Sequence, residues 1–121
     1  GGDGGGGGGA WAVEPSVNNV FGRAELRRDT ACCKFMGQAS TLTGCQQLAD
    51  NSTLAVTSVT FHLPSGTGGS WRGTCYAIID GTWLPVPVVE GQALADSARR
   101  RVPKLTQGAA GVPNGWVSDV V

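Results

Sequence analysis

The fold is decided by residues 55–79, which read AVTSVTFHLPSGTGGSWRGTCYAII. Residues 55–63 alternate in polarity with the period of two that is typical of a strand. One face of this strand is mixed and carries Val56, Ser58, Thr60 and His62. The other face is more apolar, and we expect it to pack inward; it carries Thr57, Val59, Phe61 and Leu63. After a loop rich in Gly and Ser, residues 74–79 predict a second strand.

A short helix is predicted ahead of this stretch, over residues 44–50. The segment Thr43-Gly-Cys-Gln46 matches the capping box Thr-x-x-Gln, whose side chains bond to backbone N–H groups at the start of a helix. Three residues then recur at helical spacing and share one face: Cys45, Leu48 and Ala49. Residues 25–35, still earlier in the chain, are predicted to be mostly strand.

A hairpin and a second helix are predicted on the C-terminal side. Asp80-Gly81 is a dipeptide favoured in hairpin turns, so we expect residues 83–89 to return as the partner strand. The prolines in that strand mark it as a sheet edge, because proline cannot donate to a ladder. Residues 93–101 are expected to form a helix, and residues 102–121 to wrap over the core.

The chain of 121 residues is long enough for one domain, since a compact domain usually takes about 100–200 residues. Residues 1–10 are rich in glycine and predict a flexible arm or linker. We expect residues 11–121 to form a single α+β domain, with a small antiparallel sheet, one short helix and disulfide staples. Because the sequence begins with Gly1 and not with Met, we also expect a processed form or a fragment.

Four cysteines, Cys32, Cys33, Cys45 and Cys75, predict a disulfide framework, since an even number in a small domain usually pairs. We do not expect a Cys32–Cys33 bond, because a ring closed between neighbours strains the peptide link. Two pairings remain open: 32–45 with 33–75, and 32–75 with 33–45. Free buried thiols and a zinc site are the alternatives, but no spacing matches the paired knuckles of a structural zinc site, so we expect no metal.

Charge and hydropathy exclude two classes of partner. The chain carries 9 Lys+Arg against 9 Asp+Glu, so it does not build the positive field that nucleic acid needs. No apolar stretch approaches the roughly 20 residues of a membrane span. We therefore expect neither nucleic-acid binding nor a membrane span.

Asn51-Ser52-Thr53 is an N-glycosylation sequon. It lies between the predicted helix and the predicted strand, where an acceptor loop is exposed. Disulfide formation and N-glycosylation occur in the same oxidising compartment. We therefore expect a glycan on Asn51 and an extracellular protein, either secreted or at the cell surface.

The sequence has no pattern typical of an enzyme. His62 is the only histidine, and a lone histidine on a strand more often makes a structural hydrogen bond than acts as a base. Asp80 precedes Gly81 and is interpreted as a turn former. Nucleophile-elbow, phosphate-loop and paired-carboxylate patterns are missing. We expect a non-enzymatic protein without catalytic residues or a cofactor.

Three motifs follow the cysteine-bearing helix in order: Thr57-Ser-Val-Thr-Phe-His62, Trp71-Arg-Gly-Thr-Cys-Tyr76 and Asp80-Gly-Thr-Trp-Leu-Pro85. In this order they resemble the PAN/apple-like domains of secreted and surface proteins, including those of algae and protists, over about residues 30–90. The resemblance implies a small α+β module that binds proteins or carbohydrates without catalysis. Many such domains have a cysteine where this chain has Val56, so the bridge from helix to strand needs another partner here.

The tryptophans permit two interpretations. Trp71 and Trp83 predict either core packing or a surface that stacks on a sugar ring or a protein partner. The candidate binding residues are Trp71, Arg72, Tyr76 and Trp83. The alternative function is a structural subunit of an extracellular fibre or coat, assembled head-to-tail through the N-terminal arm. In that alternative, residues 11–14 add as a strand to an exposed edge such as residues 83–89.

Overall fold

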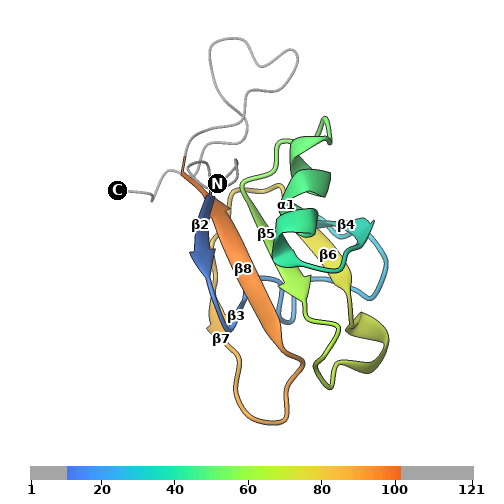
Figure 1. Ribbon diagram of the computed structural model, residues 1–121. Coiled ribbons are helices and arrows are strands. Elements are labelled where there is room, and N and C mark those ends of the chain that lie inside the picture. Colours follow the sequence, from blue (N-terminus) through green and yellow to red (C-terminus); the bar gives the residue numbers. More distant parts are fainter. Residues whose placement is uncertain (1–10, 102–121) are drawn as a thin grey trace.

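Five antiparallel strands form one sheet in the computed structural model, which describes residues 11–101 (Figure 1). Their order across the sheet is β2 (Trp11–Glu14), β8 (Ala95–Arg100), β5 (Ser58–His62), β6 (Thr74–Ile78) and β4 (Cys33–Gln38). The helix α1 (Leu42–Asp50) lies on one face of this sheet (Figure 1). The predicted α+β class, a small disulfide-stapled antiparallel sheet with a short helix, is confirmed. The predicted arm over residues 1–10 and the wrapping segment over residues 102–121 lie outside the described residues.

The helix α1 begins slightly earlier than the capping-box pattern predicts. Its N-cap is Thr41 and not Thr43, because the Thr41 Oγ1 accepts a hydrogen bond from the Gly44 backbone N–H at 3.0 Å. Cys45 and Ala49 lie one turn apart and are fully buried. The predicted helix and its inward-facing side are confirmed at these two positions.

An apolar core lies between α1 and the sheet. Val59 and Phe61 of β5 point into it, as the alternation of this strand predicts. Its buried members are Trp11, Cys45, Ala49, Val56, Val59, Phe61, Cys75, Ala77 and Ala98. At its edge the Arg100 guanidinium lies 4.3 Å from the centroid of the Trp11 ring and donates to Asp50 Oδ1 at 2.6 Å. Arg100 thereby connects β2 and β8 to the end of α1.

The opposite face of the sheet is also buried, here partly against polar groups. The more apolar face of β5 packs inward as predicted, and its mixed face is buried as well, since every residue of this strand is buried. The reason is that chain segments 17–32 and 80–93 cross this second face and contribute hydrogen-bond partners to it. Asn19 donates from its backbone N–H to Thr60 Oγ1 at 3.1 Å and from its side chain to Ser58 Oγ at 2.9 Å.

The predicted hairpin between residues 74–79 and 83–89 is wrong. Strand β6 has β5 on one side and β4 on the other, so it offers no free edge to a third strand. Instead β7 (Val86–Pro87) pairs with β3 (Val17–Asn18) in a separate two-stranded sheet. The Asp-Gly dipeptide still turns the chain, because Asp80 Oδ1 accepts a hydrogen bond from the Thr82 backbone N–H at 3.0 Å.

The predicted helix over residues 93–101 is also wrong, since Ala95–Arg100 form the strand β8. This strand lies between β2 and β5, and both neighbours supply ladder hydrogen bonds that outweigh a modest helix propensity. Trp11–Glu14 pairs with β8 within the same chain, with Trp11 opposite Arg100. The prediction that residues 11–14 add to the edge at residues 83–89 is therefore wrong. Assembly through residues 1–10 stays a prediction.

The disulfides join Cys45 to Cys75 and Cys32 to Cys33, so both predicted pairings are wrong. The side of the sheet that each cysteine faces gives the reason. Cys33 lies opposite Ile78 in the β4–β6 register and belongs to a cluster separate from the core under α1, where Cys45 and Cys75 lie. Cys32 precedes β4 in a bend, so strand geometry does not direct its side chain away from that of Cys33.

Candidate functional site

Aromatic side chains from several elements meet on the sheet face opposite α1. Trp71 ends the 3₁₀ helix η2 (Gly69–Trp71), just ahead of β6. The centroid of its ring lies 5.3 Å from that of Tyr76 on β6 and 4.9 Å from that of His62 on β5. Phe35 on β4 extends the row, with its ring centroid 5.5 Å from that of Tyr76. Tyr76 and His62 are buried, whereas Trp71 is partly exposed.

A pocket of about 210 Å³ opens beside Trp71 and His62. Such a volume corresponds to about seven water molecules at roughly 30 Å³ each. The pocket is lined by Asn18, Val20, Phe21, Gly22, Ala24, His62, Trp71, Val88, Gln92 and Ala93. The lining is mostly apolar and includes no Asp, Glu, Lys or Arg.

His62 is neutral and has both ring nitrogens occupied. The Thr74 hydroxyl donates to Trp71 O at 2.6 Å, so it accepts from the His62 Nδ1–H at 3.1 Å. Nε2 is then an acceptor for Asn18 Nδ2, 3.3 Å away. Burial lowers the pKa of His62 to about 4, with the hydrogen bond to Thr74 as a smaller opposing effect. The residue adds no charge to the pocket at neutral pH.

Two amide side chains line the pocket in fixed orientations. Asn18 Oδ1 accepts from the Val20 backbone N–H at 2.8 Å, and Gln92 Oε1 accepts from the Val89 backbone N–H at 3.2 Å. A backbone N–H can only donate, so each amide must turn its oxygen toward it. Among the described residues, the Gln92 NH₂ group and the second N–H of Asn18 Nδ2 have no acceptor. Because both residues line the pocket, these N–H groups are the candidate donors to a ligand there.

The structure brings together two of the four predicted binding residues. Trp71 lines the pocket, and the ring of Tyr76 packs against the ring of Trp71. The Tyr76 hydroxyl donates to a backbone carbonyl, and burial raises its pKa, so its role is in the fold. Arg72 is exposed outside the lining. Trp83 is also outside the lining, with its ring centroid 4.9 Å from the Arg99 guanidinium.

The amide and apolar residues of the pocket were missed in the sequence analysis. They belong to segments 18–24 and 88–93, which are distant in the sequence and meet only in the folded chain. The sequence around Asn18 gave little indication of a binding role, because the run Asn-Asn-Val-Phe is as typical of a turn as of a binding site.

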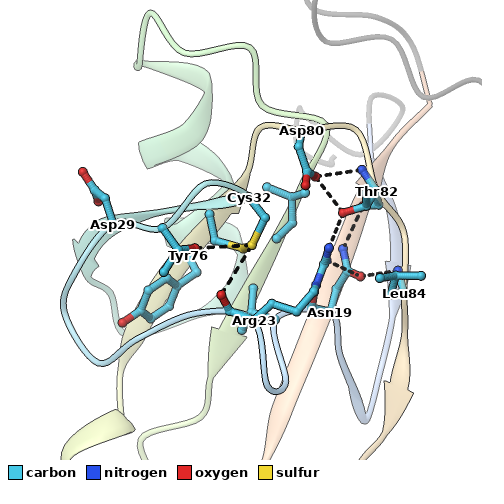
Figure 2. Close-up of a disulfide and its surroundings, with 12 residues drawn as sticks. Asn19, Arg23, Asp29, Cys32, Tyr76, Asp80, Thr82 and Leu84 are labelled. Atoms are coloured by element: carbon cyan, nitrogen blue, oxygen red, sulfur yellow. Dashed lines mark hydrogen bonds between the residues drawn. A yellow bond between two sulfur atoms is a disulfide. The ribbon is translucent and has the colours of Figure 1, made fainter.

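The Cys32–Cys33 disulfide lies beside Arg23, next to the pocket wall in sequence (Figure 2). The Cys32 Sγ lies 3.6 Å from the carbonyl oxygen of Arg23 and 3.4 Å from Thr30 Oγ1. In sequence, Arg23 stands between two residues that line the pocket, Gly22 and Ala24. The disulfide therefore contacts the segment that forms this wall.

A polar network holds the same segment in place from the other side (Figure 2). The Arg23 guanidinium donates to Asn19 and to Thr82. Thr82 Oγ1 in turn donates to Asp80 Oδ1 at 2.6 Å. Burial lowers the pKa of Arg23, and the charge of Asp80 opposes this shift. Asn19 is completely buried, and its Oδ1 also accepts from the Leu84 backbone N–H.

Asn51, the predicted glycosylation site, is exposed at the C-terminal end of α1. Its backbone N–H donates to Gln47 O at 2.9 Å, so the backbone ends the helix while the side chain stays accessible. The glycan itself stays a prediction.

Residues 11–101 contain neither a metal-binding cluster nor a membrane-spanning helix. No cluster of His, Cys, Asp or Glu in this part of the chain is arranged to hold a metal ion. In the same residues, no helix has the length and apolar character needed to cross a membrane.

Comparisons with protein-family models, curated proteins and solved structures find no match for this chain. The resemblance to PAN/apple-like domains therefore stays a prediction. One feature bears on it: Cys45 of the helix pairs with Cys75 on β6, so the bridge from helix to strand does not need a cysteine at Val56.

Proposed function

We propose that this chain is a non-enzymatic recognition module that binds an uncharged ring-shaped ligand, such as a sugar ring, in the pocket beside Trp71. The observation that carries the proposal is one pocket in which a partly exposed indole and two amide NH₂ groups, of Asn18 and Gln92, occur together. A sugar ring has a face of C–H groups that packs on an indole and hydroxyl oxygens that accept hydrogen bonds from amides. The resemblance to domains that bind proteins or carbohydrates supports the same class.

The absence of charge in the lining supports a neutral ligand. The lining has no Asp, Glu, Lys or Arg, and the lowered pKa of His62 keeps this residue uncharged at neutral pH. An ion without a partner loses its hydration on entering such a pocket, which costs several kcal/mol. Carboxylate, phosphate and ammonium groups are therefore disfavoured. The volume is below the roughly 300–1,000 Å³ of pockets for drug-sized ligands, so one ring fits better than a long chain.

Titration with neutral sugars tests this proposal. We expect glucose, galactose or N-acetylglucosamine to give saturable NMR shifts at the Trp71 indole N–H and the Gln92 NH₂ group, whereas glucuronate and glucosamine, which are charged, bind more weakly. Trp71→Ala should weaken the affinity by about tenfold or more, as for a central aromatic contact. The matched control is Trp83→Ala, which removes an indole outside the pocket and should leave the affinity unchanged.

Gln92→Ala provides a second variant, because it removes an NH₂ donor without removing an aromatic ring from the sheet face. It should weaken sugar binding while the dispersion of the NMR spectrum stays that of the folded protein. A titration in which none of the neutral sugars gives a saturable shift contradicts the proposed function.

We further propose that the protein is extracellular, since the disulfides and an exposed sequon at Asn51 are both typical of the secretory route. Expression through a eukaryotic secretory pathway should yield a chain whose mass falls on enzymatic removal of N-glycans. Thr53→Ala should abolish that mass difference. Ser52→Ala is the matched control, because it retains the Asn-x-Thr pattern and should retain the glycan. Unmodified Asn51 in the secreted wild-type protein contradicts the prediction.

A further inference from the structure

We propose that a dithiol reductant opens the Cys32–Cys33 disulfide and thereby weakens ligand binding in the pocket beside Trp71. This inference rests on the proposed function, because it concerns the regulation of the same pocket. It stands on the packing of the disulfide against the pocket wall, on its exposure relative to the other disulfide, and on its place at the start of a strand.

The disulfide and the pocket wall belong to the same apolar cluster. Cys32, Cys33 and Val20 are buried members of this cluster, and Ala24 and Trp71 pack against it. Val20, Ala24 and Trp71 also line the pocket. Because a close-packed cluster transmits small displacements, a shift of either sulfur atom changes the position of residues that a ligand touches.

A second contact joins the disulfide to the 20–24 turn, which forms much of the wall (Figure 2). The Cys32 Sγ lies 3.6 Å from Arg23 O. The turn is closed by hydrogen bonds to Val20 O from Arg23 N at 2.9 Å and from Ala24 N at 3.1 Å. It belongs to no strand or helix of the described chain, so contacts such as that with Cys32 fix its position.

The exposure of the sulfur-bearing residues makes this disulfide the accessible one. Cys32 retains 8% of its surface, whereas Cys33, Cys45 and Cys75 retain 0%. A reducing thiolate has to reach one of the sulfur atoms directly. Cys32 is the one cysteine of the four that keeps any exposed surface, so we expect the thiolate to reach the Cys32–Cys33 bond first, while the Cys45–Cys75 bond lies in the core under α1.

The reduction is an exchange between two disulfides. A thiolate of the dithiol attacks Cys32 Sγ, the bond between the cysteine sulfurs breaks, and Cys33 leaves as a thiolate that takes up a proton. The second thiol of the reductant loses its proton, and the resulting thiolate attacks the reductant sulfur that is bonded to Cys32. This step releases Cys32 as a thiolate, which takes up a proton. The protein gains two electrons and two protons, and the dithiol loses the same number as it becomes a cyclic disulfide.

The reduced pair needs more room than the bonded pair, because non-bonded atoms stay about 3.5–4.0 Å apart. Cys33 is completely buried and is held in β4 opposite Ile78. Cys32 lies in the bend before β4, so the movement falls mainly on Cys32 and on the Arg23 carbonyl beside it. The wall then departs from the shape that fits the ligand, while the sheet and the Cys45–Cys75 bond stay intact.

Selective reduction tests the proposal. The wild-type protein is treated with dithiothreitol under native conditions, free thiols are alkylated, and peptides are mapped by mass spectrometry. We expect alkylated Cys32 and Cys33 with Cys45–Cys75 still bridged, and a shift of the Trp71 indole N–H signal in the absence of sugar. The affinity for glucose, galactose or N-acetylglucosamine should fall about fivefold or more and return on reoxidation.

The double variant Cys32→Ala/Cys33→Ala is the control, because it has no bond to reduce and its affinity should be insensitive to dithiothreitol. Reduction of Cys45–Cys75 before Cys32–Cys33 overturns the proposal. Equal sugar affinities of the oxidised and selectively reduced protein overturn the redox control while leaving the proposed function standing. Failure of the oxidised protein to bind any of the sugars overturns the proposed function instead, whatever reduction does to the Trp71 signal.

Discussion

Replacing Cys45 and Cys75 together by alanine is expected to lower the free energy of unfolding by about 2–5 kcal/mol. The bond joins α1 to β6 across a sequence separation of 30 residues, so it restricts a long loop in the unfolded chain. Both cysteines are also completely buried in the core under the helix, and alanine leaves unfilled space there. Urea denaturation followed by circular dichroism, without reductant, measures the loss.

The matched control is again Cys32→Ala/Cys33→Ala, which removes the same atoms. The Cys32–Cys33 bond spans a sequence separation of 1 and closes no loop of the unfolded chain, so its removal changes the entropy of that chain little. We expect this variant to lose clearly less stability than the Cys45–Cys75 variant. An equal or greater loss in the control contradicts the assignment of the stabilisation to the long loop.

The helix and the central strands could be predicted because their signals are local. The spacing of Cys45, Leu48 and Ala49 predicts a helix, and the alternation in residues 55–63 predicts a strand. Both elements are present as α1 and β5. The fold class follows from these local signals together with the cysteines.

Elements that depend on distant partners could not be predicted in the same way. Ala95–Arg100 has the composition of a short helix, and it becomes a strand because β2 and β5 pair with it on both sides. The disulfide pairing depends on which sheet face each cysteine occupies. That information comes from the register of β4 with β6, where Cys33 lies opposite Ile78, and not from the spacing of the cysteines along the chain.

The candidate site could be predicted only in its aromatic part. Trp71 and Tyr76 are close in sequence and both were among the candidates, because large aromatic residues are either core or binding residues. Asn18 and Gln92 could not be assigned, since their role comes from the meeting of two distant segments at the pocket. Trp83 is a tryptophan like Trp71, but it lies outside the pocket. Residue type alone therefore did not show which of the two tryptophans lines the pocket.

Acidification from pH 7 to pH 4 is expected to remove about 3 kcal/mol of stability through His62 alone. The pKa of this residue is about 4 in the folded protein and 6.5 in the unfolded chain, because burial disfavours the imidazolium form. Between these values the unfolded chain binds a proton that the folded protein does not. The contribution is therefore complete above about pH 6.5 and is lost progressively as the pH falls toward 4.

The variant His62→Gln isolates this contribution, because its side chain stays uncharged while the carboxylates titrate as in the wild type. Urea denaturation at pH 7 and pH 4 should show a smaller decrease in unfolding free energy for the variant than for the wild type.

An independent measurement uses the wild type alone: His62 is the only histidine of the chain, so its ring proton signals are identified without assignment experiments. These signals should stay constant in the folded protein from pH 7 to pH 5.5, since Thr74 and Asn18 hold the neutral ring and no charged side chain lines the pocket beside it. Sugar affinity should be constant over the same range, because the pocket does not change its charge. A ring that titrates near pH 6.5 contradicts both the buried neutral histidine and the uncharged pocket that is built on it.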